Sequence, residues 1–148
     1  MTADDGSLTG IDSQHDQPTR KVYFTVASDR FSIEALTEGI GLAPDRVSSG
    51  SDRFPNQSMW EISAFGTGET DLSSMITSIL ARIRPTKERL APICADNETT
   101  CTLRIIQYVG DARLGPGFGF EYEQIALLAD LHAVIDVDQY WIPGPYPL

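Results

Sequence analysis

The clearest pattern in the sequence is a helical stripe between Asp71 and Arg84. Six apolar residues recur there at positions i, i+3, i+4, i+7, i+8 and i+11: Leu72, Met75, Ile76, Ile79, Leu80 and Ile83. This spacing places all of them on one face of an α-helix. Thr70 or Asp71 is suited to cap the first turn of that helix. The stripe needs a partner surface, so the sequence predicts a helix that packs on another element.

Alternating apolar and polar residues predict strands on both sides of this helix. The predicted strands are residues 21–28, 59–65, 99–109, 118–120 and 133–141, with a short edge strand near 46–48. In the last strand, Ile135 and Val137 share one face, which we expect to meet the helices.

Three further helical segments accompany the strands. The first runs over 32–40, where Ser32 caps the start and Gly41 ends the helix. Pro85 predicts a kink or a second short helix over 85–91, because proline is poorly tolerated inside a helix and favoured in a first turn. The last predicted helix, residues 122–131, presents an apolar face of Ile125, Leu128 and Ala129.

These elements follow the order β-α-β-α-β-β-α-β, which predicts an α+β fold. We expect a two-layer sandwich of one mixed, mainly antiparallel sheet with helices packed on one face. Residues 1–20 read as a disordered acidic leader, 21–142 as a single domain and 143–148 as a proline-rich tail. The long polar connection over 43–58 is expected to be either mobile or functional.

Charge narrows the classes of partner. The chain has 148 residues and a net charge of −10, which disfavours nucleic acid and anionic membranes and suits a basic protein partner. The sequence has neither a signal-peptide pattern nor 18 consecutive apolar residues, so we expect a cytoplasmic protein.

The cysteines and histidines give no motif for a metal or cofactor. Cys94 and Cys101 form no CxxC pair, and only His15 and His132 accompany them, so no zinc site or other cofactor is expected. Cys94 lies near a predicted helix end and Cys101 near a predicted strand start, so the two side chains can lie close enough for a disulfide. The interpretation we favour is a reduced pair, because two cysteines do not make a secreted disulfide framework.

Four stretches carry a resemblance to a known family: SDRFSIEALTEGIGLAP, MWEIS, LSSMITSILARIRP and GFGFEYEQIALLADLHAVIDVDQY. Together they resemble the bacterial family called domain of unknown function 4279, over about Val22 to Trp141. The resemblance implies an α+β domain with no assigned activity, and it carries over no catalytic residue. The loose Ser/Asp run of Asp45 to Gln57 departs from the orderly basic turn that is usual in the family.

The candidate functional residues lie on the polar face of the predicted sheet. Asp136 and Asp138 are two residues apart, so they point to the same side of the last strand as Tyr140. Arg104 and Tyr108 alternate in the same way on the strand over 99–109. If the two faces coincide, the five side chains form a polar and aromatic patch of the residue types that dominate interfaces.

Two functions fit this patch. The first is a non-catalytic protein-binding module, of which an immunity-type protein that masks a basic toxin is one form. The alternative is an enzyme, or a small-ligand or metal sensor, that uses Asp136 and Asp138, because paired carboxylates bind cations or share acid and base roles. No catalytic residue and no metal ligand set is predicted.

Overall fold

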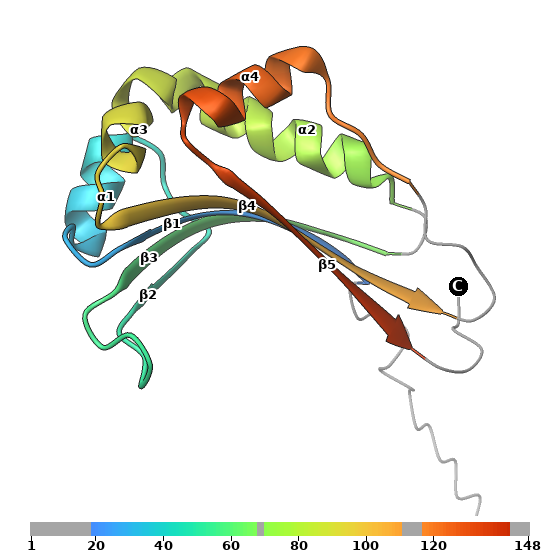
Figure 1. Ribbon diagram of the computed structural model, residues 1–148, viewed down its shortest axis with the longest axis horizontal. Coiled ribbons are helices and arrows are strands. Elements are labelled where there is room, and N and C mark those ends of the chain that lie inside the picture. Colours follow the sequence, from blue (N-terminus) through green and yellow to red (C-terminus); the bar gives the residue numbers. More distant parts are fainter. Residues whose placement is uncertain (1–18, 68–69, 111–116, 143–148) are drawn as a thin grey trace, which may run out of the picture.

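Five strands form one sheet in the computed structural model, which describes residues 19–67, 70–110 and 117–142 (Figure 1). The strands are β1 (Arg20–Ser28), β2 (Arg46–Ser49), β3 (Ser58–Gly66), β4 (Thr99–Gly110) and β5 (Val134–Ile142). Their order in the sheet is β2-β3-β1-β4-β5. Only the β4–β5 pair is parallel, and the other three pairs are antiparallel. The predicted mixed, mainly antiparallel sheet is therefore confirmed.

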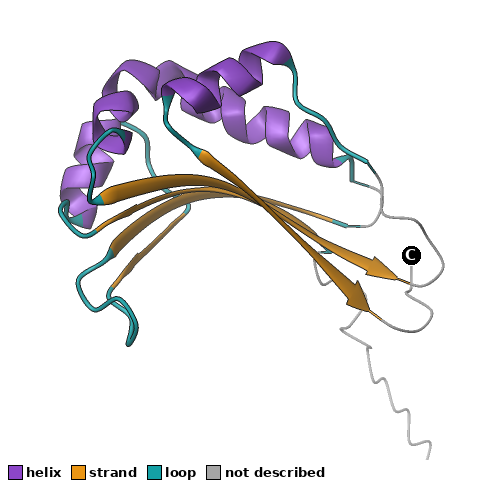
Figure 2. Ribbon diagram, in the orientation of Figure 1, coloured by secondary structure: helices purple, strands orange, loops and turns teal. Residues whose placement is uncertain are grey.

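Helices cover one face of this sheet, as Figure 2 shows. They are α1 (Ile33–Ile40), α2 (Leu72–Ile83), α3 (Lys87–Cys94) and α4 (Tyr122–Asp130), with the 3-10 turn η2 (Arg84–Thr86) between α2 and α3. Pro85 lies in that turn, which explains why the helical pattern restarts there rather than continuing unbroken. The predicted two-layer α+β sandwich is confirmed.

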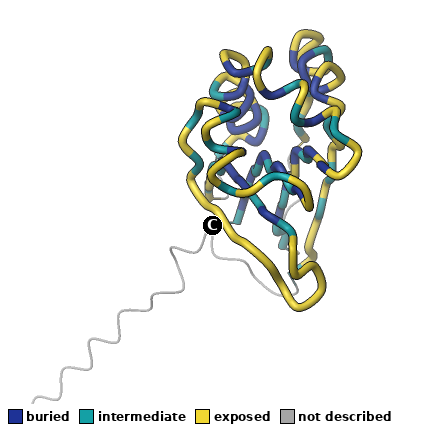
Figure 3. Tube along the Cα trace, turned by 90° about the vertical axis from the view of Figure 1, so that its left-hand side faces the viewer, coloured by how far each residue is buried: buried dark blue, intermediate teal, exposed yellow. Residues whose placement is uncertain are grey.

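The core lies between α2 and the sheet. All six residues of the predicted α2 stripe are at most 5% exposed. They share one buried cluster with Val22, Phe24 and Val26 of β1 and with Trp60 and Ile62 of β3. In Figure 3 the buried segments gather where the helices meet the sheet. Burial of this much apolar surface is the main contribution to the free energy of folding.

Local sequence signals fix the helix ends. The Ser32 hydroxyl accepts a hydrogen bond from the Ala35 N–H at 3.1 Å, and the Asp71 carboxylate accepts one from the Ser74 N–H at 3.2 Å. Gly41 ends α1 with a φ of 74°, in the left-handed region that glycine adopts without steric cost. These caps are the ones that the sequence predicts.

The short strand predicted over 118–120 is wrong, whereas the edge strand predicted near 46–48 is confirmed as β2. Both sides of β4 are already taken, by β1 and β5, so the segment has no adjoining strand edge there. Phe118 and Phe120 instead pack against the core, with their rings edge to face at 6.4 Å. The Gly119 N–H donates to the Ser73 hydroxyl at 3.1 Å.

The apolar face predicted for α4 is also partly wrong. Ile125 is 52% exposed, and the buried residues are Gln124, Leu127 and Leu128. Gln124 determines this rotation: its amide oxygen accepts from the Glu121 N–H at 2.9 Å, and its amide nitrogen donates to Thr77 of α2 at 2.9 Å. A satisfied polar side chain thus takes a core-facing position that hydrophobic spacing alone assigns elsewhere.

The predicted end of the leader needs correction by two residues. Arg20 is the first residue of β1, is only 8% exposed and donates to the Thr70 carbonyl oxygen. The Thr19 N–H donates to the Gly66 carbonyl at 3.0 Å. The rest of the predicted leader and the predicted tail lie outside the described residues.

The connection over 43–58 contains β2 and the hairpin that joins it to β3. It is the longest exposed stretch in the described chain and forms a projecting loop in Figure 3. Asp45 holds its start in place, because its carboxylate accepts from Arg82 of α2 at 2.6 and 3.1 Å and from the Ser63 N–H at 2.9 Å. The Arg82 guanidinium is the main reason that the pKa of Asp45 is lowered.

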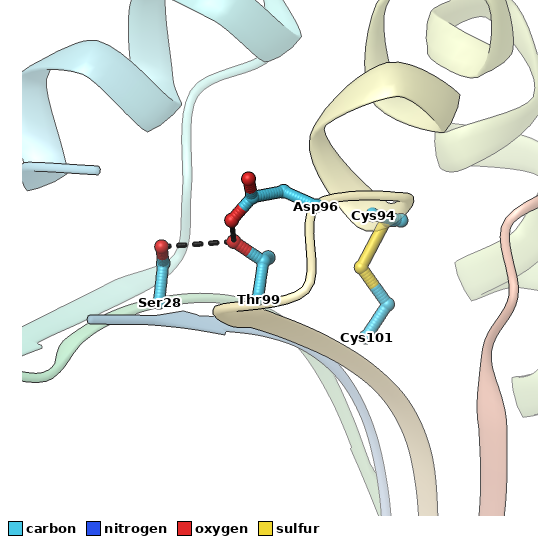
Figure 4. Close-up of a disulfide and its surroundings, with 5 residues drawn as sticks. All are labelled: Ser28, Cys94, Asp96, Thr99 and Cys101. Carbon is cyan, nitrogen blue, oxygen red and sulfur yellow. Dashed lines mark hydrogen bonds between the residues drawn. A yellow bond between two sulfur atoms is a disulfide. The ribbon is translucent and has the colours of Figure 1, made fainter. Parts of the chain in front are cut away.

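The expectation of reduced cysteines is wrong for this structure. Cys94, at the end of α3, is bonded to Cys101 of β4, and both side chains are buried (Figure 4). The chain between them is short, with a sequence separation of 7, and it folds the end of α3 back over the start of β4. Beside the disulfide, the Ser28 and Thr99 hydroxyls are 2.9 Å apart.

Candidate functional site: the open face of the sheet

The face of the sheet turned away from the helices, here called the open face, carries the predicted patch. Cross-strand register aligns its residues in rows. One row runs from Tyr23 of β1 through Arg104 of β4 to Asp136 of β5. The next row runs from Lys21 through Ile106 to Asp138. Side chains directly opposite on neighbouring strands are close enough to interact.

Arg104 joins the two aspartates. Its Nε and Nη2 atoms both lie 3.0 Å from Oδ2 of Asp136, and Nε lies 4.0 Å from Oδ2 of Asp138. The three side chains are between 38% and 49% exposed. Both carboxylates are therefore accessible to a partner, with Arg104 fixing the orientation of Asp136.

The two tyrosines of the patch stack on each other. The rings of Tyr108 and Tyr140 are parallel within 22°, with centroids 5.2 Å apart. The ammonium of Lys21 lies 5.9 Å from the Tyr108 centroid, within range of a cation–π interaction. Stacking limits the freedom of Tyr140, whose side chain nevertheless remains 48% exposed. The structure thus brings together all five residues that the sequence singled out.

The same face contains residues that the sequence analysis did not select, above all Glu61. It lies on β3 opposite Arg46 of β2 and is only 7% exposed. In the described part of the chain its carboxylate makes no hydrogen bond and no ion pair. Burial raises its pKa, Asp45 adds to the rise, and Arg46 and Arg104 oppose it. Burial and the nearby Glu61 also raise the pKa of Tyr23.

The alternation of polar and apolar residues in the sequence indicates part of the position of Glu61 and Tyr23. Alternation already places Glu61 on the polar side of β3 and Tyr23 on the polar side of β1. Alternation does not say which strands are neighbours, so it could not show that Tyr23 lies beside Arg104. Only the strand order of the sheet supplies that information.

The prediction that Ile135 and Val137 meet the helices is wrong. They do share the helix side of the sheet with Leu103 and Ile105, their neighbours in register, as predicted. They are nevertheless 42% and 44% exposed, because β5 is an edge strand beyond the buried cluster. The inner face of β5 is therefore mainly apolar, with Gln139 as its polar member, and it is not buried.

The functional groups that this face presents are two carboxylates, a guanidinium and two phenol rings. Among the described residues there is no group of three histidine, cysteine or acidic side chains that could hold a metal ion. Within those same ranges, none of the helices has the length and apolar character needed to cross a membrane.

Comparison with known proteins assigns the chain to a family. Residues 17–141 of 148 match the family described as domain of unknown function (DUF4279). The chain belongs to that family, as its sequence motifs predict. Neither the search of curated proteins nor that of solved structures gave a match.

Proposed function

We propose that this chain is a non-catalytic protein-binding module whose open face receives a basic partner protein. The observation that carries the proposal is the solvent-accessible group of Arg104, Asp136, Asp138, Tyr108 and Tyr140 on the face of the sheet that none of the described helices covers. Tyrosine and arginine contribute disproportionately to interface energies. A net charge of −10 favours the encounter with a basic partner, because complementary charge raises the association rate.

The alternative, an enzyme or a small-ligand or metal sensor, has weaker support. It depends on Asp136 and Asp138 acting as a free carboxylate pair. Arg104 contacts both, so a cation would have to compete with a guanidinium that is already in place. A protein partner can in addition contact the tyrosine pair Tyr108 and Tyr140, which offers binding surface without displacing Arg104.

The particular form that we propose is an immunity-type protein of a bacterial cell, which masks a basic toxin. This form rests on analogy with other small acidic α+β proteins rather than on a residue of the site. A cytoplasmic location stays a prediction, and the state of Cys94 and Cys101 tests it, because disulfides persist mainly in oxidising compartments. Thiol trapping in intact cells should label both cysteines if the protein is cytoplasmic.

A pull-down from the native host, followed by mass spectrometry, tests the proposal. The full chain is compared with the double variant Asp136→Asn and Asp138→Asn. A matched control, Glu34→Gln with Glu38→Gln, removes the same charge from exposed positions of α1 in the opposite layer. We expect a basic protein to be recovered by the wild type and the control, and about fivefold less by the aspartate variant at low salt. Equal recovery of the partner by all three proteins would show that Asp136 and Asp138 of the open face do not bind it.

A further inference from the structure

The two edges of the sheet differ sharply. β2 is four residues long, whereas β5 is nine residues long and pairs with β4 at every position from Val134 to Ile142. Proteins protect sheet edges with short strands, charged side chains (lysine above all), proline, bulges or covering segments. The charged residues of β5, Asp136 and Asp138, repel an acidic strand but not a basic one. β2 is protected by its length. β5 contains neither lysine nor proline, its ladder has no bulge, and no other described strand pairs with its outer side.

β5 also exposes apolar side chains on both of its faces. The exposed apolar residues, between 42% and 62% accessible, are Val134, Ile135, Val137, Tyr140 and Trp141. Ile135, Val137 and Trp141 lie on the helix side, in register with residues 103, 105 and 109 of β4. Asp136 and Asp138 lie on the open face. An added strand would therefore meet a mainly apolar row, interrupted by Gln139, on one face and a row that contains both aspartates on the other.

Charge argues against a second copy of this chain as the occupant. A two-fold antiparallel pairing centred on residue 136, 137 or 138 would place aspartate opposite aspartate. Like charges directly opposite each other destabilise a strand pair. Each copy also carries a net charge of −10, which opposes association.

From these features we infer that β5 is a strand-addition site for an extended segment of a basic partner protein. The segment pairs with the outer edge of β5 through main-chain hydrogen bonds. It alternates basic residues, which face Asp136 and Asp138, with apolar residues, which cover Ile135 and Val137. The inference rests on the proposed function and specifies how the partner docks at the margin of the open face.

The probe is a nine-residue peptide, blocked at both ends, that alternates lysine and valine. A glutamate–valine peptide controls for charge. A lysine–valine peptide that is N-methylated at every backbone amide keeps the side chains and removes the main-chain donors. Binding to the full chain is measured by fluorescence anisotropy, and hydrogen exchange by mass spectrometry locates the contact.

We expect the lysine–valine peptide to bind and to slow exchange within residues 134–142. The glutamate and N-methylated peptides should bind at least tenfold more weakly. Val137→Lys should weaken binding tenfold, whereas Val47→Lys should change it less than twofold. Val47 is the matched control, because it is equally exposed, at 44%, on the helix side of the opposite edge strand. Should Val137→Lys lower the melting temperature, Trp141→Ala at a 62% exposed position replaces it.

Several results would overturn the inference. Absence of binding, equal affinity for the N-methylated peptide, or slowed exchange away from β5 would each do so. A dimer in sedimentation that Val137→Lys dissociates would show that a second copy occupies the edge. Slow exchange of every amide over 135–142 in the free protein would show that the edge is already covered. Binding that survives N-methylation but needs Asp136 and Asp138 would reject strand addition while leaving the proposed function intact.

Discussion

Glu61 is a strand carboxylate held against the sheet instead of in solvent. Alternation assigns it to the polar face of β3, where a solvated side chain is the ordinary expectation. Its 7% exposure shows that neighbouring side chains of the open face cover it. The electrostatic groups around it are Arg46, Asp45, Arg104 and the Tyr23 hydroxyl. Because burial outweighs the two arginines, the pKa of Glu61 is raised.

This environment gives a pH dependence with a definite sign. A raised pKa means that the folded state binds the Glu61 proton more tightly than the unfolded state does. The contribution of Glu61 to the free energy of unfolding should therefore fall as the pH rises from the ordinary glutamate pKa, about 4.3, through the raised value. We expect Glu61→Gln to increase the free energy of unfolding at pH 7 and to lose that advantage below pH 4.

Urea denaturation of both proteins between pH 3 and 8 measures this difference, with exposed Glu98→Gln as the control. A variant that is less stable than wild type at pH 7 would mean that Arg46 holds the carboxylate in a stabilising pair.

At the scale of elements, α2 shows how much a strong pattern can predict. Its boundaries, its Asp71 cap and its six buried residues all follow from the sequence. α4 and β5 show where such prediction stops. Spacing could not rank Gln124 above Ile125, because a buried amide is acceptable only through its hydrogen bonds with the Glu121 N–H and with Thr77 of α2. It could not tell that Ile135 would be exposed, because a strand's place at a sheet edge depends on pairing between distant segments.

Ile79 lies in the middle of the α2 stripe and is 1% exposed. We expect Ile79→Ala to lower the free energy of unfolding by about 2–5 kcal/mol, through lost burial and a residual cavity. Ser78→Ala, at the adjoining exposed position, should change it by less than about 0.5 kcal/mol. Chemical denaturation checks both values, and similar losses would contradict the assigned face of α2.

The edge position of β5 predicts that an alanine substitution destabilises the protein less on β5 than on β4. Ile135→Ala should cost less than about 1 kcal/mol, because much of its side chain already contacts water, whereas Ile105→Ala on β4 should cost about 2–5 kcal/mol. The same denaturation experiment measures both. Equal costs would show that β5 is covered in solution.

At the scale of the whole molecule, the disulfide ties the helical layer to the sheet. Cysteine number and spacing did not predict it, because two cysteines give no framework and their proximity depends on how α3 turns back over β4. The contacts on the open face likewise depend on segments that are far apart in the sequence. Its five predicted residues came from alternation along single strands, but the Arg104–Asp136 contact exists only because β5 pairs with β4.

Reduction of the Cys94–Cys101 bond should lower the free energy of unfolding by about 2–3 kcal/mol, the value that loop-closure entropy gives for so short a loop. Denaturation with and without a thiol reductant measures the change. The double variant Cys94→Ala with Cys101→Ala is the control, since its stability should not respond to reductant. A wild type that also fails to respond would show that the cysteines are reduced in solution.

The central claim is that the open face, and not the helical layer, binds the partner. Two exposed tyrosines allow a direct test, since Tyr140 lies on the open face and Tyr122 on α4. The affinity of the captured partner is measured by calorimetry for wild type, Tyr140→Ala and Tyr122→Ala. We expect Tyr140→Ala to weaken binding about tenfold or more, as truncation of an interface tyrosine commonly does, and Tyr122→Ala to change it less than about twofold. Unchanged affinity for Tyr140→Ala, or a larger loss for Tyr122→Ala, would contradict the claim.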